Sequence, residues 1–256
     1  MQFGVCGGPD VGKIAANLGY DYLESSVGTI LKPTEDEAAF KAAVAAFAEQ
    51  PLPVPVVNCF VPGNLKITGP DVDFPALEAY VDTVCSRAAE AKVEVIVFGS
   101  GGARQIPEGF DRAEAEKQLV AFGKMVGPTA GKYGVTVVVE PLNAKECNVL
   151  TTVGESARYV REVDHPNFQL LVDGYHWGLD NDSAQDVIDS GPLFQHTHIA
   201  TWPNRQAPGA EACDMASFFN ALKESGYDGR VSIEGRLNDP NETLAPALAC
   251  MKELAG

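Results

Sequence analysis

The sequence has few basic residues. Its 256 residues include 19 lysines and arginines against 35 aspartates and glutamates, which gives a formal net charge of −16 at pH 7. A protein that binds duplex nucleic acid needs a basic surface to neutralise phosphates, and an anionic membrane surface attracts clustered Lys and Arg. The charge balance therefore argues against both kinds of partner.

Long apolar segments and closely spaced cysteines are also missing. No apolar stretch approaches the ~20 residues of a membrane span. The first residues, MQFGVCGGPD, lack a positively charged start followed by an apolar run, so we expect no signal peptide. None of the six cysteines forms a CxxC zinc or redox pair. A domain of this length buries roughly 70–75% of its unfolded surface without disulfides, so we expect reduced cysteines and a cytoplasmic location.

Short β-rich runs alternate with helical patterns along the whole chain. The eight expected strands are residues 2–6, 20–24, 54–61, 93–99, 135–140, 168–173, 194–199 and 231–234. The helices expected between them are residues 11–18, 35–49, 75–91, 111–132, 153–162, 183–189, 214–225 and 242–254. Eight β/α units in about 250 residues predict an α/β protein that forms a single (β/α)8 TIM barrel over residues 1–256. The rival, an open doubly wound sheet, needs a GxGxxG loop that CGGPDVG matches only loosely.

Acidic side chains and one histidine end the last four expected strands. They are Glu140 in VVVEPLN, Asp173 in LLVDGYHWG, His198 in HTHIA and Glu234 in VSIEGR, and 33, 25 and 36 residues separate them. Each gap is about one β/α unit, so the four side chains are expected to converge on the rim that is catalytic in TIM barrels. For any one of them, a helix cap or a salt bridge remains an alternative. As a set, three carboxylates and an imidazole indicate a site for Mn²⁺, Mg²⁺ or Co²⁺.

With these residues, the chain resembles the xylose isomerase-like sugar isomerase/epimerase superfamily, which includes ketose 3-epimerases and hydroxypyruvate isomerases. The resemblance spans the chain and is carried by EPLNAKECN, DGYHWG, HTHIATWPNRQAPG and IEGR, with weaker support from GYDYLE and FGSGGARQIPEGF. It implies that Glu140, Asp173, His198 and Glu234 bind one divalent cation, with Mn²⁺ expected. It also implies that His176 and Arg205 contact a substrate oxygen and that Glu146 contacts a sugar hydroxyl.

Arg104, His196 and the loop around Thr201 add further features. Arg104, in a glycine-rich loop, is expected to bind a substrate phosphate or carboxylate, or else to pair with an acid. His196 shares a strand face with His198 and is expected to lie below the rim. Family members commonly have an acid a few residues after the ligand histidine, where this chain has Thr201 in a loop one residue longer. That departure affects how Arg205 is placed.

The expected reaction is proton abstraction and return on a ketose or a related small hydroxy-carbonyl sugar, through an enediolate that the cation stabilises. Glu140 and Glu234 are the expected proton-transfer groups. A metal-dependent lyase or dehydratase, including one that cleaves a C-glycoside of a 3-keto sugar, is the alternative on the same scaffold. A degenerate sugar-binding barrel and an abasic-site endonuclease are further alternatives, although the endonucleases use more histidines than the four present here. The resemblance also leaves a homo-oligomer open.

Overall fold

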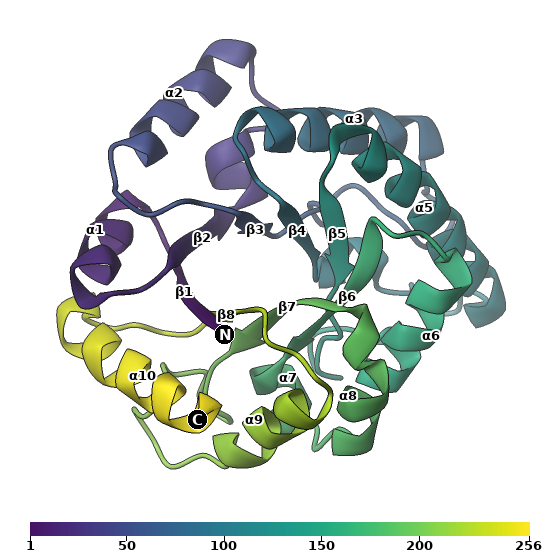
Figure 1. The fold of residues 1–256 in the computed structure, drawn as a ribbon. Helices are drawn as coiled ribbons and strands as arrows, with labels where there is room; N and C mark the ends of the chain where they lie inside the picture. Colours follow the sequence, from purple (N-terminus) through teal and green to yellow (C-terminus); the bar gives the residue numbers. More distant parts are fainter.

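Eight short segments, most of them apolar, form the strands of the computed structural model, which describes all 256 residues. The strands are β1 (Gln2–Cys6), β2 (Tyr22–Ser26), β3 (Val56–Asn58), β4 (Val95–Phe98), β5 (Thr136–Val139), β6 (Phe168–Asp173), β7 (Phe194–Ile199) and β8 (Arg230–Ile233). All pair in parallel with their sequence neighbours, and β1 pairs with β8, so the sheet closes into a barrel (Figure 1). The predicted TIM-barrel fold is confirmed.

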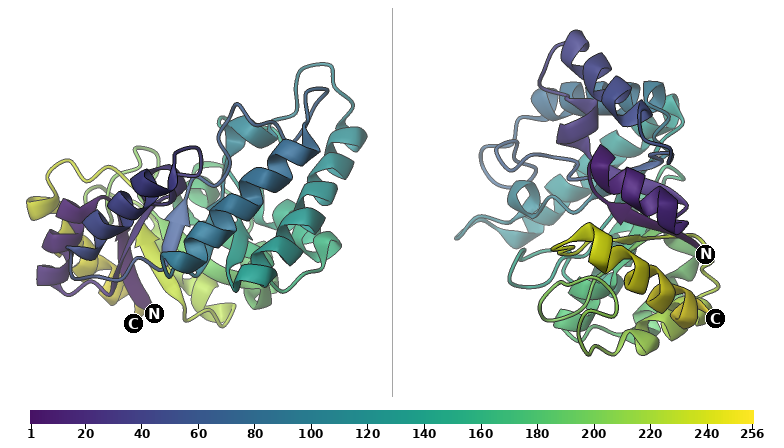
Figure 2. Two further views of the ribbon diagram at one scale, coloured as in Figure 1. Left: turned by 90° about the horizontal axis from the view of Figure 1, so that it is seen from above. Right: turned by 90° about the vertical axis from the view of Figure 1, so that its left-hand side faces the viewer.

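Helices surround this barrel in the views of Figures 1 and 2. Those that were expected are α1 (Pro9–Leu18), α2 (Glu37–Ala48), α3 (Phe74–Glu90), α5 (Arg112–Tyr133), α6 (Val153–Val163), α8 (Ala184–Ser190), α9 (Met215–Glu224) and α10 (Pro240–Ala255). Aspartate side chains cap the amino ends of α2, α3, α5 and α9 by accepting a backbone N–H of the first turn.

Four short helices were not expected from the sequence. They are the π-helix η1 (Val27–Leu31), α4 (Gly101–Arg104), α7 (Gly174–Leu179) and the 3-10 helix η2 (Gly191–Leu193). The strand β3 is shorter than expected at both ends, because Pro55 has no N–H to donate to a ladder and Cys59 has a φ of 57°, outside the β region. The strand β2 lies two residues later than expected, which places Glu24 inside the strand and not at its end.

The two-residue period of each strand separates the barrel interior from the layer under the helices. Six apolar side chains form a small cluster of their own in the interior: Tyr22, Val56, Val95, Val97, Val138 and Leu171. Gly4 leaves room for the Tyr22 ring, which would lie 2.2 Å from a Cβ at that position. Three of these apolar residues are followed, two positions later, by an acid. Glu24 follows Tyr22, Glu140 follows Val138 and Asp173 follows Leu171. The interior therefore changes from apolar to polar towards the carboxyl ends of the strands.

A register shift between β6 and β7 aligns two of the predicted metal ligands. Leu170 pairs with Phe194, but Leu171 pairs with His196, so one residue of β7 has no partner. The shift brings Asp173 opposite His198 at the end of the ladder. Such bulges often lie next to functional sites, where they redirect a side chain.

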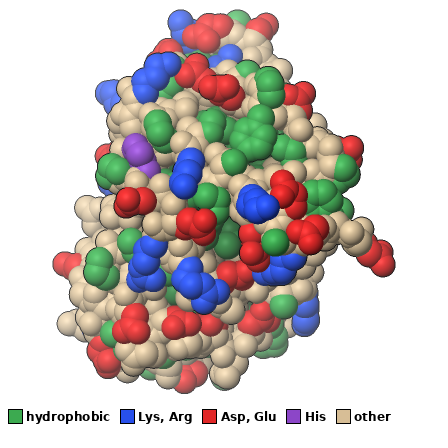
Figure 3. All heavy atoms as spheres, turned by 90° about the vertical axis from the view of Figure 1, so that its right-hand side faces the viewer, with side chains coloured by type: hydrophobic (Ala, Val, Ile, Leu, Met, Phe, Trp, Pro, Cys, Tyr) green, Lys and Arg blue, Asp and Glu red, His purple; other side chains and the backbone are tan.

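The exterior agrees with the charge and hydropathy expected from the sequence. On the face shown in Figure 3, acidic side chains are interspersed with Lys and Arg, and no large basic area is visible. None of the helices is both long and apolar enough to span a bilayer.

Candidate metal centre and active site

Glu140, Asp173, His198 and Glu234 lie together at the carboxyl end of the barrel. Glu140 and Glu234 directly follow β5 and β8, Asp173 ends β6, and His198 is the penultimate residue of β7. One potential ligand atom from each of the four lies within 4.8 Å of the other three. The side chains that strand spacing predicts to converge therefore do so.

The carboxylate of Asp173 has one satisfied and one unsatisfied oxygen. Its Oδ1 accepts the backbone N–H of Tyr175 at 2.8 Å, which fixes the orientation of the side chain. Its Oδ2 is buried and has no hydrogen-bond partner. Buried acceptors in folded proteins are nearly always paired, so an orphaned carboxylate oxygen is what a bound cation would satisfy.

The ring of His198 is fully buried and presents a different nitrogen to each side. Its Nε2 lies 2.8 Å from Oε1 of Glu24, below the rim. Its Nδ1 lies 3.1 Å from Oε1 of Glu140 and 3.6 Å from Oε2 of Glu234. Nδ1 is therefore the nitrogen that faces the carboxylates of Glu140 and Glu234.

These donors fit a divalent cation. Three carboxylates and one imidazole nitrogen are a donor set for Mn²⁺, Mg²⁺ or Co²⁺. Oδ2 of Asp173 has no hydrogen-bond partner, and Asp173 and His198 both belong to this four-residue cluster. A carboxylate on the far nitrogen of a ligating histidine, as Glu24 provides here, is a common feature of protein metal sites.

The surroundings of Glu140 and Glu234 shift their pKa values in opposite directions. Burial raises the pKa of Glu234 to about 8, and the nearby carboxylates of Glu140 and Asp173 add to the effect against the opposing influence of His198. Burial also opposes ionisation of Glu140, but the hydrogen bond and charge of His198 outweigh it and hold the pKa of Glu140 below its usual range. Without a cation, Glu234 therefore holds a proton more tightly than Glu140 does.

His176, predicted to contact substrate, is held in one tautomer. Its Nδ1 accepts the backbone N–H of Asn143 at 3.1 Å and faces the side-chain amide of the same residue at 2.7 Å. The proton is therefore on Nε2, which is buried, has no hydrogen-bond partner and lies 3.5 Å from Oδ2 of Asp173. His176 thus offers one free N–H donor beside the predicted metal centre.

Arg205 also reaches this centre. Its guanidinium forms an ion pair with Glu234 and lies 3.8 Å from Oδ2 of Asp173 and 3.7 Å from Glu146. The guanidinium also lies over the ring of Tyr175, 4.6 Å from the ring centroid. The neighbouring carboxylates outweigh burial and raise the pKa of Arg205 above its usual value.

The cavity above these residues has a volume of about 670 Å³. Its lining includes Glu140, Glu146, His176, Arg205 and Glu234, together with glycines and prolines of the loops after β2, β3 and β4. Oε1 of Glu146 accepts a hydrogen bond from Asn143 at 2.8 Å, which holds that carboxylate at the wall. The cavity is large enough for a monosaccharide, and few of the residues that line it are hydrophobic.

The structure corrects the expectation for Arg104. This side chain is 0% exposed and does not line the cavity. Its guanidinium donates to the backbone carbonyls of Phe98, Glu140 and Leu150, at 3.0, 2.8 and 3.3 Å. The short helix α4, which the glycines of this loop allow, turns the side chain into the protein, so it contacts neither a ligand in the cavity nor an acid.

Glu24 and Asn58 belong to the site but were not among the predicted residues. Glu24 bridges His196 and His198, and Nδ2 of Asn58 donates to Oε1 of Glu234 at 3.1 Å. Both come from the first half of the barrel, whereas the prediction drew on the last four strands. A charged residue two positions after Tyr22 in a buried strand was the available signal for Glu24. His196 lies below the rim, as expected.

An acid from further along the chain contacts the loop after β7. The hydroxyl of Thr201 donates to the carboxylate of Glu211, which also accepts from the side chain of Asn204 at 2.6 Å. Oγ1 of Thr201 in turn accepts the N–H of Gln206 at 3.0 Å. These bonds close the loop at its base and hold Arg205 over the cavity.

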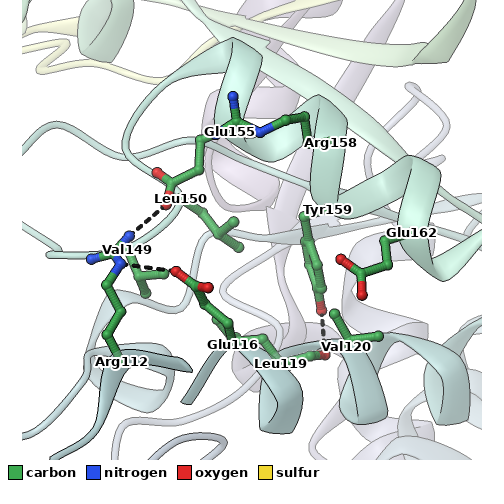
Figure 4. Close-up of a pocket in the computed structure, with 10 residues that line it drawn as sticks. All are labelled: Arg112, Glu116, Leu119, Val120, Val149, Leu150, Glu155, Arg158, Tyr159 and Glu162. Carbon is green, nitrogen blue, oxygen red and sulfur yellow. Dashed lines mark hydrogen bonds and ion pairs between the residues drawn. The ribbon is translucent and has the colours of Figure 1, made fainter. Parts of the chain in front are cut away.

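A second pocket, of about 350 Å³, lies outside the barrel between α5 and α6 (Figure 4). Arg112 at its edge pairs with both Glu116 and Glu155 at 2.8 Å, and the hydroxyl of Tyr159 donates to the carbonyl of Leu119. None of the predicted site residues lines this pocket.

The sequence matches the family described as Xylose isomerase-like TIM barrel over residues 13–254. The chain belongs to this family. It is 31% identical over 143 residues to 3-dehydro-D-guloside 4-epimerase of Escherichia coli (strain K12), an alignment that covers 54% of each chain. It is 26% identical over 231 residues to L-ribulose 3-epimerase of Methylomonas sp. (strain DH-1), covering 86% of this chain and 75% of the relative.

A solved structure of D-psicose 3-epimerase in the presence of D-fructose has the same fold. It superposes with a TM-score of 0.86 at 20% identity and covers 100% of both chains. The family and fold are therefore established. Because the match to the Escherichia coli epimerase spans about half the length of that relative, the activity of this chain has to be argued from its own site.

Proposed function

We propose that this protein is a divalent-metal-dependent epimerase or isomerase of a ketose or a related hydroxy-carbonyl sugar. The observation that carries the proposal is the placement of Glu140 and Glu234. Strands β5 and β8 bring both of them to Nδ1 of His198, and their pKa values are displaced in opposite directions. A pair of carboxyl groups with separated pKa values is the arrangement expected of a base and an acid.

The proposed cation is held by Glu140, Asp173, His198 and Glu234, and Mn²⁺ suits this set of three oxygens and one nitrogen. When bound, it supplies Lewis acidity to the carbonyl and neighbouring hydroxyl oxygens of the sugar, which makes the C–H between them more acidic.

The side chains of the protein would carry the proton. One of the two glutamates takes the proton from the C–H bond, whose electron pair moves to the carbonyl oxygen to give an enediolate. The other returns a proton from its own carboxyl group. Return to the opposite face of the same carbon gives an epimer, and return to the adjacent carbon gives the aldose–ketose isomer.

His176 and Arg205 would stabilise the oxygen that gains charge. Nε2–H of His176 is free, buried and fixed in orientation by Asn143, so no reorganisation is needed when it donates. Glu146 accepts from a sugar hydroxyl at the wall of the cavity. The names of the relatives, a 4-epimerase of a keto-glycoside and a 3-epimerase of a ketose, support a sugar with a carbonyl next to the inverted carbon.

The test is a panel of ketoses, 3-keto-glycosides and hydroxypyruvate, incubated with the Mn²⁺-loaded protein in deuterated buffer. Products are identified by NMR and mass spectrometry after the metal is removed. We expect one substrate to gain deuterium beside the carbonyl and to give a product of otherwise unchanged composition. Release of water or of an aglycone would assign the protein to the lyase class instead, and the absence of any exchange would contradict the proposal.

A further inference from the structure

Glu24 carries a carboxylate deep inside the barrel, with histidines as its ion-pair partners. Its Oε1 lies 2.8 Å from Nε2 of His198, and its Oε2 lies 2.9 Å from Nε2 of His196. All three side chains are 0% exposed. A charge in this position would be strongly unfavourable without close hydrogen-bonding partners, so the arrangement calls for a specific reason.

The carboxylate of Glu24 determines where His198 carries its proton. An ionised carboxylate only accepts hydrogen bonds, so Nε2 of His198 must be the donor. The other nitrogen, Nδ1, faces Glu140 and Glu234 at the predicted metal centre. A histidine that binds a metal needs a bare nitrogen towards the ion, and the hydrogen bond at the far nitrogen fixes which one that is.

Without Glu24, the competing arrangement would be favoured. The remaining acceptor within hydrogen-bond distance of the His198 ring is Oε1 of Glu140, 3.1 Å from Nδ1. A neutral ring with no acceptor at Nε2 would place its proton on Nδ1 and donate it to Glu140. That tautomer blocks the nitrogen that would bind the cation and also occupies a carboxylate oxygen of a second ligand.

His196 holds Glu24 from the other side. Its ring lies edge-on to that of His198, with centroids 5.0 Å apart and planes at 89°. Its Nε2 is also 3.3 Å from Oγ of Ser232, which is 2.9 Å from the hydroxyl of Tyr22. The two histidines of β7 therefore hold the two oxygens of Glu24, whereas Ser232 of β8 contacts His196 and Tyr22 but not the carboxylate.

We propose that Glu24 is a positioning residue of the metal centre, which holds the proton of His198 on Nε2 so that Nδ1 is free to bind the cation. His196 supports it by fixing the second carboxylate oxygen. The inference rests on the proposed function in one respect, the assignment of His198 as a metal ligand.

The test replaces Glu24 by glutamine, which keeps the shape but leaves one acceptor oxygen for two N–H donors. Protein labelled with ¹⁵N-histidine is studied by long-range ¹H–¹⁵N NMR, with both proteins metal-free. Wild type is expected to carry the His198 proton on Nε2, and Glu24→Gln is expected to carry it on Nδ1. The dissociation constants of Glu24→Gln for Zn²⁺ and Mn²⁺ should rise about 10–100-fold.

Two further variants separate positioning from folding. Ser232→Ala removes a hydrogen bond in the same buried network without touching the carboxylate of Glu24, so it should leave metal affinity and the His198 proton unchanged. Glu24→Asp keeps the acceptor on a shorter stem and should restore part of the affinity if Glu24→Gln does not fold. The proposal is overturned if Glu24→Gln keeps the wild-type proton position and affinity, or if Ser232→Ala weakens the metal equally.

Metal binding and turnover by the wild-type protein test the proposed function independently of Glu24. A wild-type protein that binds no divalent cation contradicts the metal-dependent function itself. A wild-type protein that binds the cation and exchanges deuterium into a sugar, together with an unaltered Glu24→Gln variant, contradicts only the role of Glu24.

Discussion

Nδ1 of His198 lies 3.1 Å from Oε1 of Glu140, closer than the 3.6 Å that separates it from Oε2 of Glu234. A basic nitrogen and a carboxylate oxygen thus meet where both are proposed to bind the same ion. A proton and a cation therefore compete for this nitrogen, and that competition underlies the first prediction.

Metal binding should become tighter as pH rises. Glu24 and Glu234 hold the pKa of His198 well above its usual value despite its burial. Because Nε2 of the ring donates to Glu24, a second proton would sit on Nδ1, and a cation that binds there must release it. Calorimetric titration of Mn²⁺ in two buffers of different ionisation enthalpy should detect this release at pH 7. Heats independent of the buffer would contradict it.

Asp173→Asn should abolish tight metal binding. Oδ2 of Asp173 is the buried acceptor without a partner, and the amide lacks the charge that attracts the cation. Because the loss of residues behind the ligands already weakens metal affinity about 10–100-fold, we expect at least about 100-fold here. Electron paramagnetic resonance measures free Mn²⁺ during a titration. Glu116→Gln, on the outer pocket, is the matched control and should bind Mn²⁺ like wild type.

Asn143→Ala should impair turnover while leaving metal affinity intact. The substitution removes the side-chain contacts to His176 and Glu146 but keeps the backbone N–H that reaches Nδ1 of His176. Hydrogen bonds of this kind contribute about 1–2 kcal/mol, so kcat/KM should fall roughly 5–30-fold. Steady-state kinetics at saturating Mn²⁺ measure kcat/KM, and a parallel Mn²⁺ titration measures the metal affinity. A loss of metal affinity equal to the loss of turnover would count against a role in substrate contact.

Arg104→Met should destabilise the fold and not the reaction. The guanidinium satisfies three buried carbonyls, and each buried group left unpaired costs about 1–3 kcal/mol. Arg104→Lys keeps the charge but loses the planar fork, so it should also unfold at lower denaturant concentration than wild type. Urea unfolding, monitored by circular dichroism, measures the difference in unfolding free energy between each variant and wild type. Wild-type stability together with a raised KM for an anionic sugar would restore the substrate-binding role.

Strand spacing predicted the convergence of Glu140, Asp173, His198 and Glu234 because a closed parallel barrel brings all carboxyl strand ends to one rim. The role of Glu24 could not be read in this way, since it depends on β2 facing β7 across the interior. The alignment of Asp173 with His198 depends on a bulge that leaves no sequence signal. For Arg104, neighbouring glycines indicated an open loop, but they permit a helical turn that buries the side chain.

The most direct test of the account follows proton transfer in the Glu140→Gln and Glu234→Gln variants, each first shown to bind Mn²⁺. With the substrate identified by the panel, solvent deuterium incorporation and formation of the epimer or isomer are recorded together by NMR. We predict that wild type does both, that neither variant converts the sugar, and that the variant retaining the base still exchanges deuterium without inversion. Continued conversion of the sugar by either metal-loaded variant would contradict proton transfer between these two carboxyl groups.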